Sequence, residues 1–184
     1  VIHSLVSISD TTFMSGGENG CVRQWEASTT SLKEQPTPGF KKFLLADKDI
    51  HKIVIKNDVL AVLQQNAVYH IDMSAGKVLA QYIANFDDVL DMAVVDDEFL
   101  IVASNSPTLT VYNLKSKSFS FLEGHKDSIL SLSSSTRGRF ASSGKDLGVR
   151  VWERKTADSD EFECIGECQG HATTVGSVAI AEDG

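Results

Sequence analysis

His125, Ser142 and Asp146 together have the composition of a hydrolase triad. In such an enzyme a histidine acts as general base for the serine, and an oxyanion hole stabilises the charge of the tetrahedral intermediate. No nucleophile elbow surrounds Ser142, and the repeat described below gives all three residues a role in packing. Because residue types alone do not make a catalytic site, we predict that these residues are structural and that the chain is not an enzyme.

A cysteine pair followed by a histidine is the candidate metal site. Cys164 and Cys168 have C-x-x-x-C spacing, and His171 stands three residues further on. Structural zinc sites normally show two-residue spacing and a second ligand pair, so we predict ordinary cysteines on a strand and no metal. Glycine loops of the GxxxxGK[ST] or GxGxxG type are also absent from the sequence. We therefore expect no cofactor and no small-molecule substrate.

Two kinds of charged cluster could bind macromolecules. An acidic cluster lacks the glycine and terminal glutamate of a calcium loop; we interpret it as solvated turns, with a docking face for a basic partner as the alternative. Basic residues beside aromatics could contact RNA, but their scatter along an acidic chain favours exposed turns. The acidic residues are Asp87, Asp88, Asp91 and Asp96–Glu98, and the basic runs are Lys41–Phe43, Lys115–Phe119 and Arg137–Phe140.

The elements that would position these residues are short strands. Most segments are β-rich runs of four to seven residues bounded by Gly, Asn, Asp and Ser, which is typical of β-strands. Examples are Lys52–Lys56, Val59–Leu63, Phe99–Ala103 and Gly148–Trp152. The sequence therefore predicts an all-β protein.

Composition excludes several classes of protein. Ile, Val, Leu and Phe recur throughout the 184 residues, unlike in a disordered tail. No apolar run is long enough to span a membrane, and no signal peptide is visible. A net charge of −8 argues against a domain that binds mainly phosphates. Three cysteines are too few and too odd in number for a disulfide framework, which favours a reducing compartment.

A four-fold repeat organises the strands. Each copy is an apolar strand, a small polar turn and a second strand that ends in a large apolar residue. The copies are Phe13–Trp25, Leu60–Ile71, Val102–Leu114 and Phe140–Trp152. A period of about 40–45 residues indicates the blades of a β-propeller, each of which must stack on its neighbours to bury its faces.

Two landmarks identify the kind of blade. Gly124-His125 recurs as Gly170-His171, and Trp-Glu pairs occur at Trp25 and Trp152. This combination is the signature of WD40 repeats. By resemblance to that fold family, four side chains of one blade hydrogen-bond in sequence, and a second blade retains three of them while its histidine would lie before Val1. The first set is His125, Ser142, Asp146 and Trp152, and the second is Ser15, Asn19 and Trp25.

The blade count predicts an incomplete ring. Roughly four repeats fit in the chain, whereas propellers usually have 4–8 blades, and both ends fall within a blade. We therefore expect a WD40 β-propeller fragment of about four blades. The two middle blades lack both Trp and Gly-His, which predicts purely apolar packing there.

Several stretches resemble one family more closely. In order, Asp88–Met92, Ile101–Pro107, Val111–Leu114, Gly124–Leu132, Phe140–Asp146, Val149–Trp152 and Gly170–Val178 are similar to the transducin beta-like protein 3 family. The resemblance covers residues 86–184 closely and 1–85 loosely. That family has two consecutive WD40 propellers and a C-terminal helical domain. The resemblance implies that residues 1–122 are the last blades of a first propeller and residues 123–184 the first of a second, both truncated.

The same resemblance implies a function. The family provides a non-catalytic scaffold subunit of the small-subunit processome in the nucleus and nucleolus, which acts in pre-rRNA processing and small ribosomal subunit biogenesis. The implied partners are other processome proteins, including WD40 subunits, together with the small nucleolar ribonucleoprotein and pre-rRNA, mainly through the complex. No membrane partner is expected. The alternative is a WD40 substrate-recognition or signalling adaptor module, since the same repeats serve both.

Overall fold

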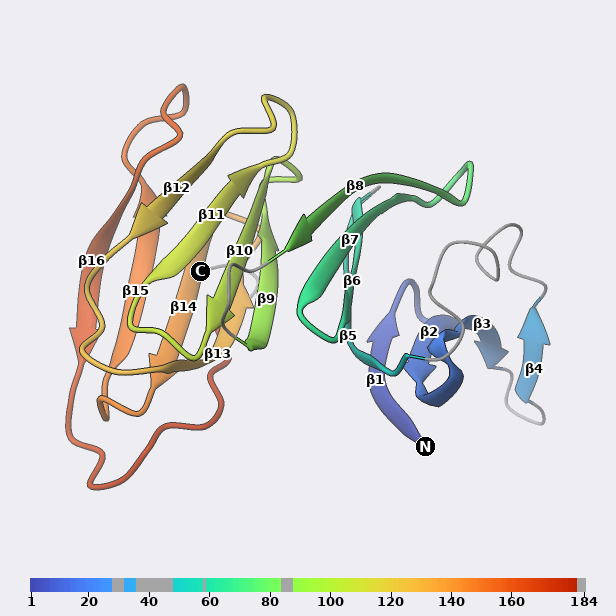
Figure 1. Cartoon of the computed structure of the whole chain (residues 1–184), viewed down its shortest axis with the longest axis horizontal. Helices are drawn as coiled ribbons and strands as arrows, with labels where there is room; N and C mark the ends of the chain where they lie inside the picture. The colour runs from blue at the N-terminus through green and yellow to red at the C-terminus, as the bar shows by residue number, and fades with distance from the viewer. Residues whose placement is uncertain (28–31, 36–47, 58, 84–87, 182–184) are drawn as a thin grey trace. The chain divides into compact units, whose positions relative to one another are not determined.

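The computed structural model describes residues 1–27, 32–35, 48–57, 59–83 and 88–181. These residues form four antiparallel sheets of four strands each, in two compact units, Val1–Asn85 and Phe86–Gly184 (Figure 1). The predictions of an all-β chain and of about four blades are therefore confirmed. Lys41–Phe43 and Asp87 lie outside the described residues.

The first unit contains two blades. Strands follow one another across each sheet in chain order, as they do when every neighbour is joined by a hairpin. The first blade is β1 (Ile2–Ser7), β2 (Thr12–Gly17), β3 (Val22–Ala27) and β4 (Leu32–Gln35), with a short 3-10 turn, η1 (Glu18–Gly20), between β2 and β3. The second blade is β5 (Ile50–Lys56), β6 (Val59–Gln64), β7 (Ala67–Asp72) and β8 (Lys77–Ile83).

The second unit contains the other two blades, built in the same order. The third blade is β9 (Val89–Val95), β10 (Phe99–Ser104), β11 (Leu109–Asn113) and β12 (Phe119–Leu122). The fourth blade is β13 (Ile129–Ser134), β14 (Arg139–Gly144), β15 (Val149–Arg154) and β16 (Phe162–Cys168). The strands β9 and β13 are neighbours, so both blades belong to one body. The division between two rings at residues 122 and 123 stays a prediction.

Tight turns set the register of these sheets. Gln65 in the turn between β6 and β7 and Asp96 and Asp97 in the turn between β9 and β10 have positive φ angles. Tight hairpin turns often place a residue in this conformation because its twist suits the flanking strands. These two short turns therefore help to fix which residues face each other across the β6–β7 and β9–β10 hairpins.

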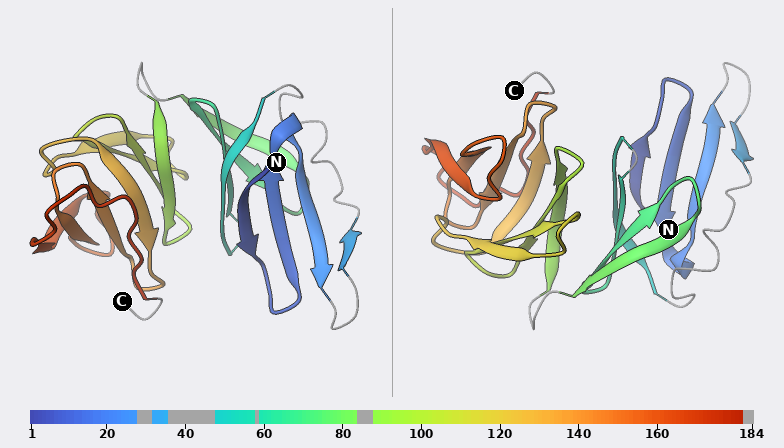
Figure 2. Two further views of the ribbon diagram at one scale, coloured as in Figure 1. Left: turned by 90° about the horizontal axis from the view of Figure 1, so that it is seen from below. Right: turned by 90° about the horizontal axis from the view of Figure 1, so that it is seen from above.

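Each unit has its own apolar core between two sheets that lie face to face (Figure 2). In the first unit Met14 and Val22 pack against Ile50, Leu60 and further residues of the second blade. In the second unit Phe99 and Ile101 pack against Ile129, Phe140 and Trp152. Strand β6 is buried along its whole length, which explains its unbroken apolar sequence. No helix of the described residues is long and apolar enough to cross a membrane.

The cross-strand pairs show which residues are equivalent in the four blades. Phe13 faces Trp25 in the first blade as Phe140 faces Trp152 in the fourth, and Leu60 faces Ile71 in the second. In the third blade Leu100 faces Tyr112. Our assignment of Leu114 to this position was wrong by two residues. Tyr112 and Leu114 are two residues apart in the sequence, so an alternating apolar pattern alone did not distinguish them.

Candidate functional site

The four predicted polar residues of the fourth blade are in contact. His125 precedes β13, Ser142 lies on β14, Asp146 in the turn that follows, and Trp152 on β15. The distance from His125 Nε2 to Ser142 Oγ is 2.7 Å, and His125 Nδ1 lies 2.8 Å from Asp146 Oδ2. The indole N–H of Trp152 donates to Ser142 Oγ at 2.7 Å. We call this chain of hydrogen bonds the relay.

The direction of each hydrogen bond follows from the chemistry of the groups. A carboxylate only accepts, so the Nδ1–H of His125 donates to Asp146, and Nε2 accepts from the Ser142 hydroxyl. Burial lowers the pKa of His125 despite the opposing attraction of Asp146. Burial alone would raise the pKa of Asp146, but the hydrogen bonds from the Lys126 N–H and from His125 outweigh it, and the pKa lies below its usual value. A neutral histidine therefore joins an ionised aspartate to a serine.

The relay is closed to a substrate. Ser142 is 0% exposed and Trp152 is 1% exposed, so the hydroxyl that would attack is covered and already bonded on both sides. The backbone of Gly124, in the loop before β13, packs so closely on the Trp152 ring that a Cβ at this position would lie 2.8 Å from it. The glycine of the Gly-His landmark is thus required by the close approach of the indole. This geometry supports a structural role and provides no opening for hydrolysis.

Stability should depend on pH through this histidine. The folded protein keeps His125 neutral, whereas the unfolded chain binds a proton near pH 6.5, so stability is full above that value and falls as the pH drops toward the lowered folded pKa. We expect the urea midpoint of the second unit, followed by Trp152 fluorescence in a Trp25→Phe background, to fall between pH 7.5 and 5.5. In His125→Gln the free energy of unfolding should depend less steeply on pH, by the equivalent of up to one proton. An unchanged slope would show that His125 is not responsible.

The first blade carries a shorter version of the relay. Trp25 Nε1 donates to Ser15 Oγ at 2.7 Å, as in the fourth blade. Phe13 stacks on Trp25 with ring centroids 6.3 Å apart, and Phe140 stacks on Trp152 at 6.1 Å. Asn19 belongs to η1, at the position of Asp146, and its side chain lies outside the described part of the structure. The two tryptophans therefore occupy equivalent places.

The middle blades replace the relay by other packing. In the second blade Val62 stands where the fourth has Ser142, and buried Leu60 and Ile71 complete an apolar version. The third blade has Val102 at the serine position. It has a half-buried Tyr112 at the tryptophan position, and burial raises the pKa of that phenol. At this position the packing is purely apolar in the second blade and not in the third, while elsewhere in the second blade Gln64 is a buried polar residue.

A second set of hydrogen bonds, between the first strand of a blade and the backbone that follows that blade, was not predicted from the sequence. Ser4 Oγ accepts from the Ile53 N–H at 2.9 Å, Asp91 Oδ2 from the Leu132 N–H at 2.7 Å, and Ser131 Oγ from the Val178 N–H at 3.3 Å. The three acceptors occupy equivalent positions on the first strands of their blades. Each therefore fixes its blade to the backbone that follows. The only sequence signal is a short polar residue in an apolar strand.

The interpretation of the whole acidic cluster as solvated turns is therefore wrong for Asp91. This residue is 6% exposed, and its second oxygen accepts from the Met92 N–H at 2.8 Å. Glu98 is also largely covered and lies 3.4 Å from both Arg154 and Lys115. Asp88 and Asp96 are exposed, as predicted. Burial separates members of a cluster that look alike in the sequence.

The other candidate residues have ordinary surroundings. Arg139 and Phe140 both lie on β14, where Phe140 is fully buried and Arg139 pairs with Glu153 at 2.8 Å, so the interpretation of Arg137–Phe140 as an exposed turn is wrong for these two residues. Cys164 and Cys168 are exposed on β16, as predicted for a strand-borne pair. Across the described ranges no three His, Cys, Asp or Glu side chains come together in a way that could hold a metal ion.

Comparison with curated proteins identifies the relatives of the chain. It is 30% identical over 174 residues to transducin beta-like protein 3 of Bos taurus, a match that covers 92% of the chain and 21% of that protein. It is 28% identical over 103 residues to the ribosome biogenesis protein WDR12 homolog of Drosophila persimilis, which covers 53% of the chain and 24% of the relative. The chain thus spans less than a quarter of the length of each of these relatives.

Comparison of folds agrees with the strand order described above. The crystal structure of the RRP9 WD40 repeats matches with a TM-score of 0.68 at 18% identity and covers 95% of this chain and 52% of that one. Residues 116–153 match the family "WD domain, G-beta repeat", which includes the turn after β11, the Gly-His landmark and the strand that bears Trp152. With two tryptophan-bearing blades of equivalent geometry and four sheets of the same strand order, the chain has the fold of WD40 repeats, matches the WD40 family model at residues 116–153 and is similar to transducin beta-like protein 3.

Proposed function

We propose that the chain belongs to a non-catalytic scaffold subunit of the nucleolar small-subunit processome, which acts in pre-rRNA processing and small ribosomal subunit biogenesis. The observation that carries the proposal is the similarity to transducin beta-like protein 3 along 92% of the chain. The similarity to a second relative, a ribosome biogenesis protein WDR12 homolog, is consistent with this proposal.

A scaffold requires rigid display, and the geometry of the blades suits that requirement. The polar side chains of the relay are bonded to one another and buried, so they stabilise one blade geometry. The hydrogen bonds that Ser4 and Asp91 accept fix the spacing between successive blades, and Ser131 accepts an equivalent bond from the backbone after the fourth blade. Partners are then held by loops and outer strands, without a chemical step.

The charge of the chain indicates the kind of partner. A net charge of −8 favours contact with basic proteins, which are common among ribosomal and nucleolar components. We therefore propose that the protein contacts other processome proteins directly, including WD40 subunits. It would meet the small nucleolar ribonucleoprotein and pre-rRNA mainly through the complex, in the nucleus and nucleolus.

Co-purification tests the proposal. The full-length protein, tagged at its own locus, should enrich pre-rRNA of the small subunit and a small nucleolar RNA at least tenfold over an untagged strain, and a fluorescent tag should label nucleoli. The matched control is a tagged WD40 protein of the cytoplasm. Enrichment of ubiquitin-ligase or signalling components without either RNA would instead support an adaptor and would overturn the proposal.

A further inference from the structure

The outer strand of the third blade has an exposed aromatic face. Phe119 and Phe121 on β12 are 59% and 62% exposed, although most aromatic side chains of this unit are buried. Their rings contact each other edge to face with centroids 5.7 Å apart, and Tyr112 on the neighbouring β11 lies 6.1 Å from Phe119. Phe119 and Phe121 are two residues apart on one strand, so their side chains point to the same side of the sheet.

The backbone of the same two residues points away from the sheet. Asn113 donates its N–H to the Ser118 carbonyl at 3.0 Å, which makes this pair a hydrogen-bonded one. In an antiparallel ladder such pairs alternate with non-hydrogen-bonded pairs. Tyr112–Phe119 and Thr110–Phe121 are therefore of the second kind. The N–H and C=O groups of both phenylalanines consequently face the outer edge, where β12 has no neighbouring strand among the described residues.

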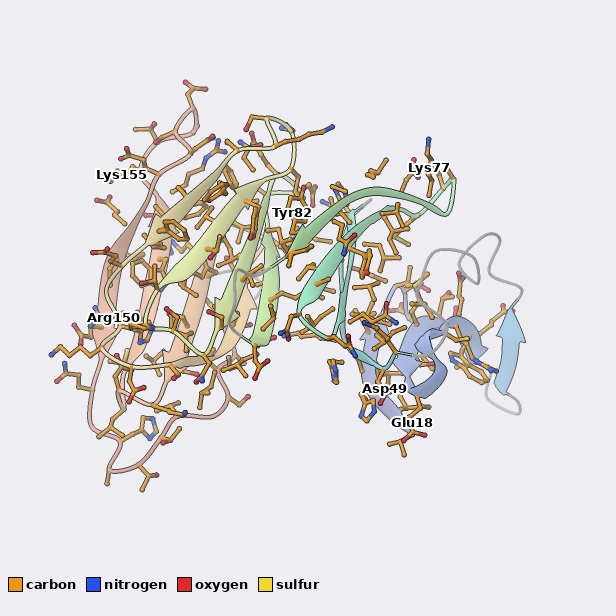
Figure 3. All side chains as sticks on the ribbon, viewed as in Figure 1. Glu18, Asp49, Lys77, Tyr82, Arg150 and Lys155 are labelled. Carbon is orange, nitrogen blue, oxygen red and sulfur yellow. The ribbon has the colours of Figure 1, made fainter. Side chains whose placement is uncertain are left out.

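The other outer strands carry charges that hinder such pairing. Strand β16 includes exposed Glu163 and Glu167, and β8 begins with exposed Lys77, which is labelled in Figure 3. Charged side chains on an edge strand are a common protection against pairing with another chain. Strand β12, with the sequence Phe-Ser-Phe-Leu, has no charged residue. Of the four outer strands in the described part of the chain, β12 alone therefore lacks a charge that would hinder pairing with another strand.

The flanking charges indicate what that partner carries. The turn that leads into β12 contains Lys115 and Lys117, both exposed. Lys115 and Arg154 both lie 3.4 Å from Glu98, so these two cations share one carboxylate, and exposed Lys117 adds a further positive charge to the turn. An acidic side chain of a partner would complement them, and an apolar one would cover the aromatic rings.

We propose that β12 binds an extended segment of a protein partner as a fifth, antiparallel strand. Backbone groups of Phe119 and Phe121 would pair with the segment, alternate apolar side chains would cover their rings, and an acidic C-terminal end would lie beside Lys115 and Lys117. This is the β-augmentation mode of peptide recognition, in which main-chain bonds supply affinity and alternate side chains supply specificity. The inference deepens the proposed scaffold role and rests on it only for its biological use.

A defined peptide tests the surface. The probe is a fluorescein-labelled peptide of eight alternating valines and threonines followed by two aspartates, measured by anisotropy with the 184-residue chain. We expect saturable binding with a Kd below about 1 mM. N-methylation of the amides that would face β12, or replacement of the aspartates by lysines, should weaken binding at least about tenfold. So should Phe119→Ser together with Phe121→Ser, whereas Ile165→Ser on β16, a similarly exposed residue, should leave binding unchanged.

Three outcomes would overturn the inference. The first is no binding of the aspartate peptide to a chain whose circular dichroism and melting temperature are normal. The second is equal binding of the N-methylated peptide, which would mean that the backbone edge is not used. The third is tighter, phenylalanine-dependent binding of a twelve-nucleotide oligouridine, which would make the face an RNA-stacking surface. Because co-purification of the full-length protein with pre-rRNA is measured separately, failure of the peptide alone would leave the proposed function standing.

Discussion

Trp152→Ala is expected to unfold the fourth blade under conditions in which the unchanged chain is folded. The indole is 1% exposed, stacks on Phe140 and donates to Ser142, so its removal leaves a large cavity and takes a donor from a buried hydroxyl. Truncation of a buried tryptophan costs about 3–5 kcal/mol, which is a large part of the stability of an ordinary domain. Urea unfolding followed by far-ultraviolet circular dichroism measures the loss.

Two matched variants separate packing from hydrogen bonding. Trp152→Phe retains a ring against Phe140 and loses only the N–H, so we expect a cost of about 1–3 kcal/mol. Trp25→Ala, at the equivalent place in the first blade, should cost less than Trp152→Ala because Trp25 is only half-buried. If Trp152→Phe lost as much stability as Trp152→Ala, the hydrogen bond of the relay would contribute more to stability than the packing of the indole ring. If neither variant lost stability, the structural role of the relay would be refuted.

Asp91→Ala is expected to loosen the contact between the third and fourth blades. The carboxyl group accepts from the N–H groups of both Met92 and Leu132, and alanine would leave these two buried donors without it. Each unpaired group costs about 1–3 kcal/mol, so we expect the second unit to lose about 2–6 kcal/mol. Trp152 fluorescence in a Trp25→Phe background follows this unit alone, because the chain has two tryptophans.

Serine at the same position provides the rescue. Ser4 accepts the equivalent bond between the first two blades, and Ser131 accepts it from the backbone after the fourth, so Asp91→Ser should recover part of the stability that alanine loses. Asp88→Ala, at an exposed aspartate of the same cluster, is the control and should change stability by less than about 0.5 kcal/mol. Equal stability of the alanine and serine variants would show that the bond between blades contributes nothing measurable.

The relay could be predicted because its spacing is set locally. Ser142 and Trp152 lie on the two strands of one hairpin, and a short turn that contains Asp146 fixes their register. Once the Gly-His and Trp-Glu landmarks identified the blade, the place of His125 followed from the resemblance. Tyr112 was missed because neither landmark occurs in the third blade, and a large apolar residue stands two positions away at Leu114.

The amino-acid sequence by itself determined the strands, the four-blade repeat and the residues of the relay, because alternation of apolar side chains and tight turns act within a single hairpin. Only the tertiary structure decided which polar residues are buried. Asp91 and Asp96 belong to the same acidic cluster, yet the first bonds to the backbone of Leu132 in the next blade and the second is exposed to solvent. Such contacts join residues distant in sequence, and their energies depend on what the neighbouring strand presents, which composition and spacing do not encode.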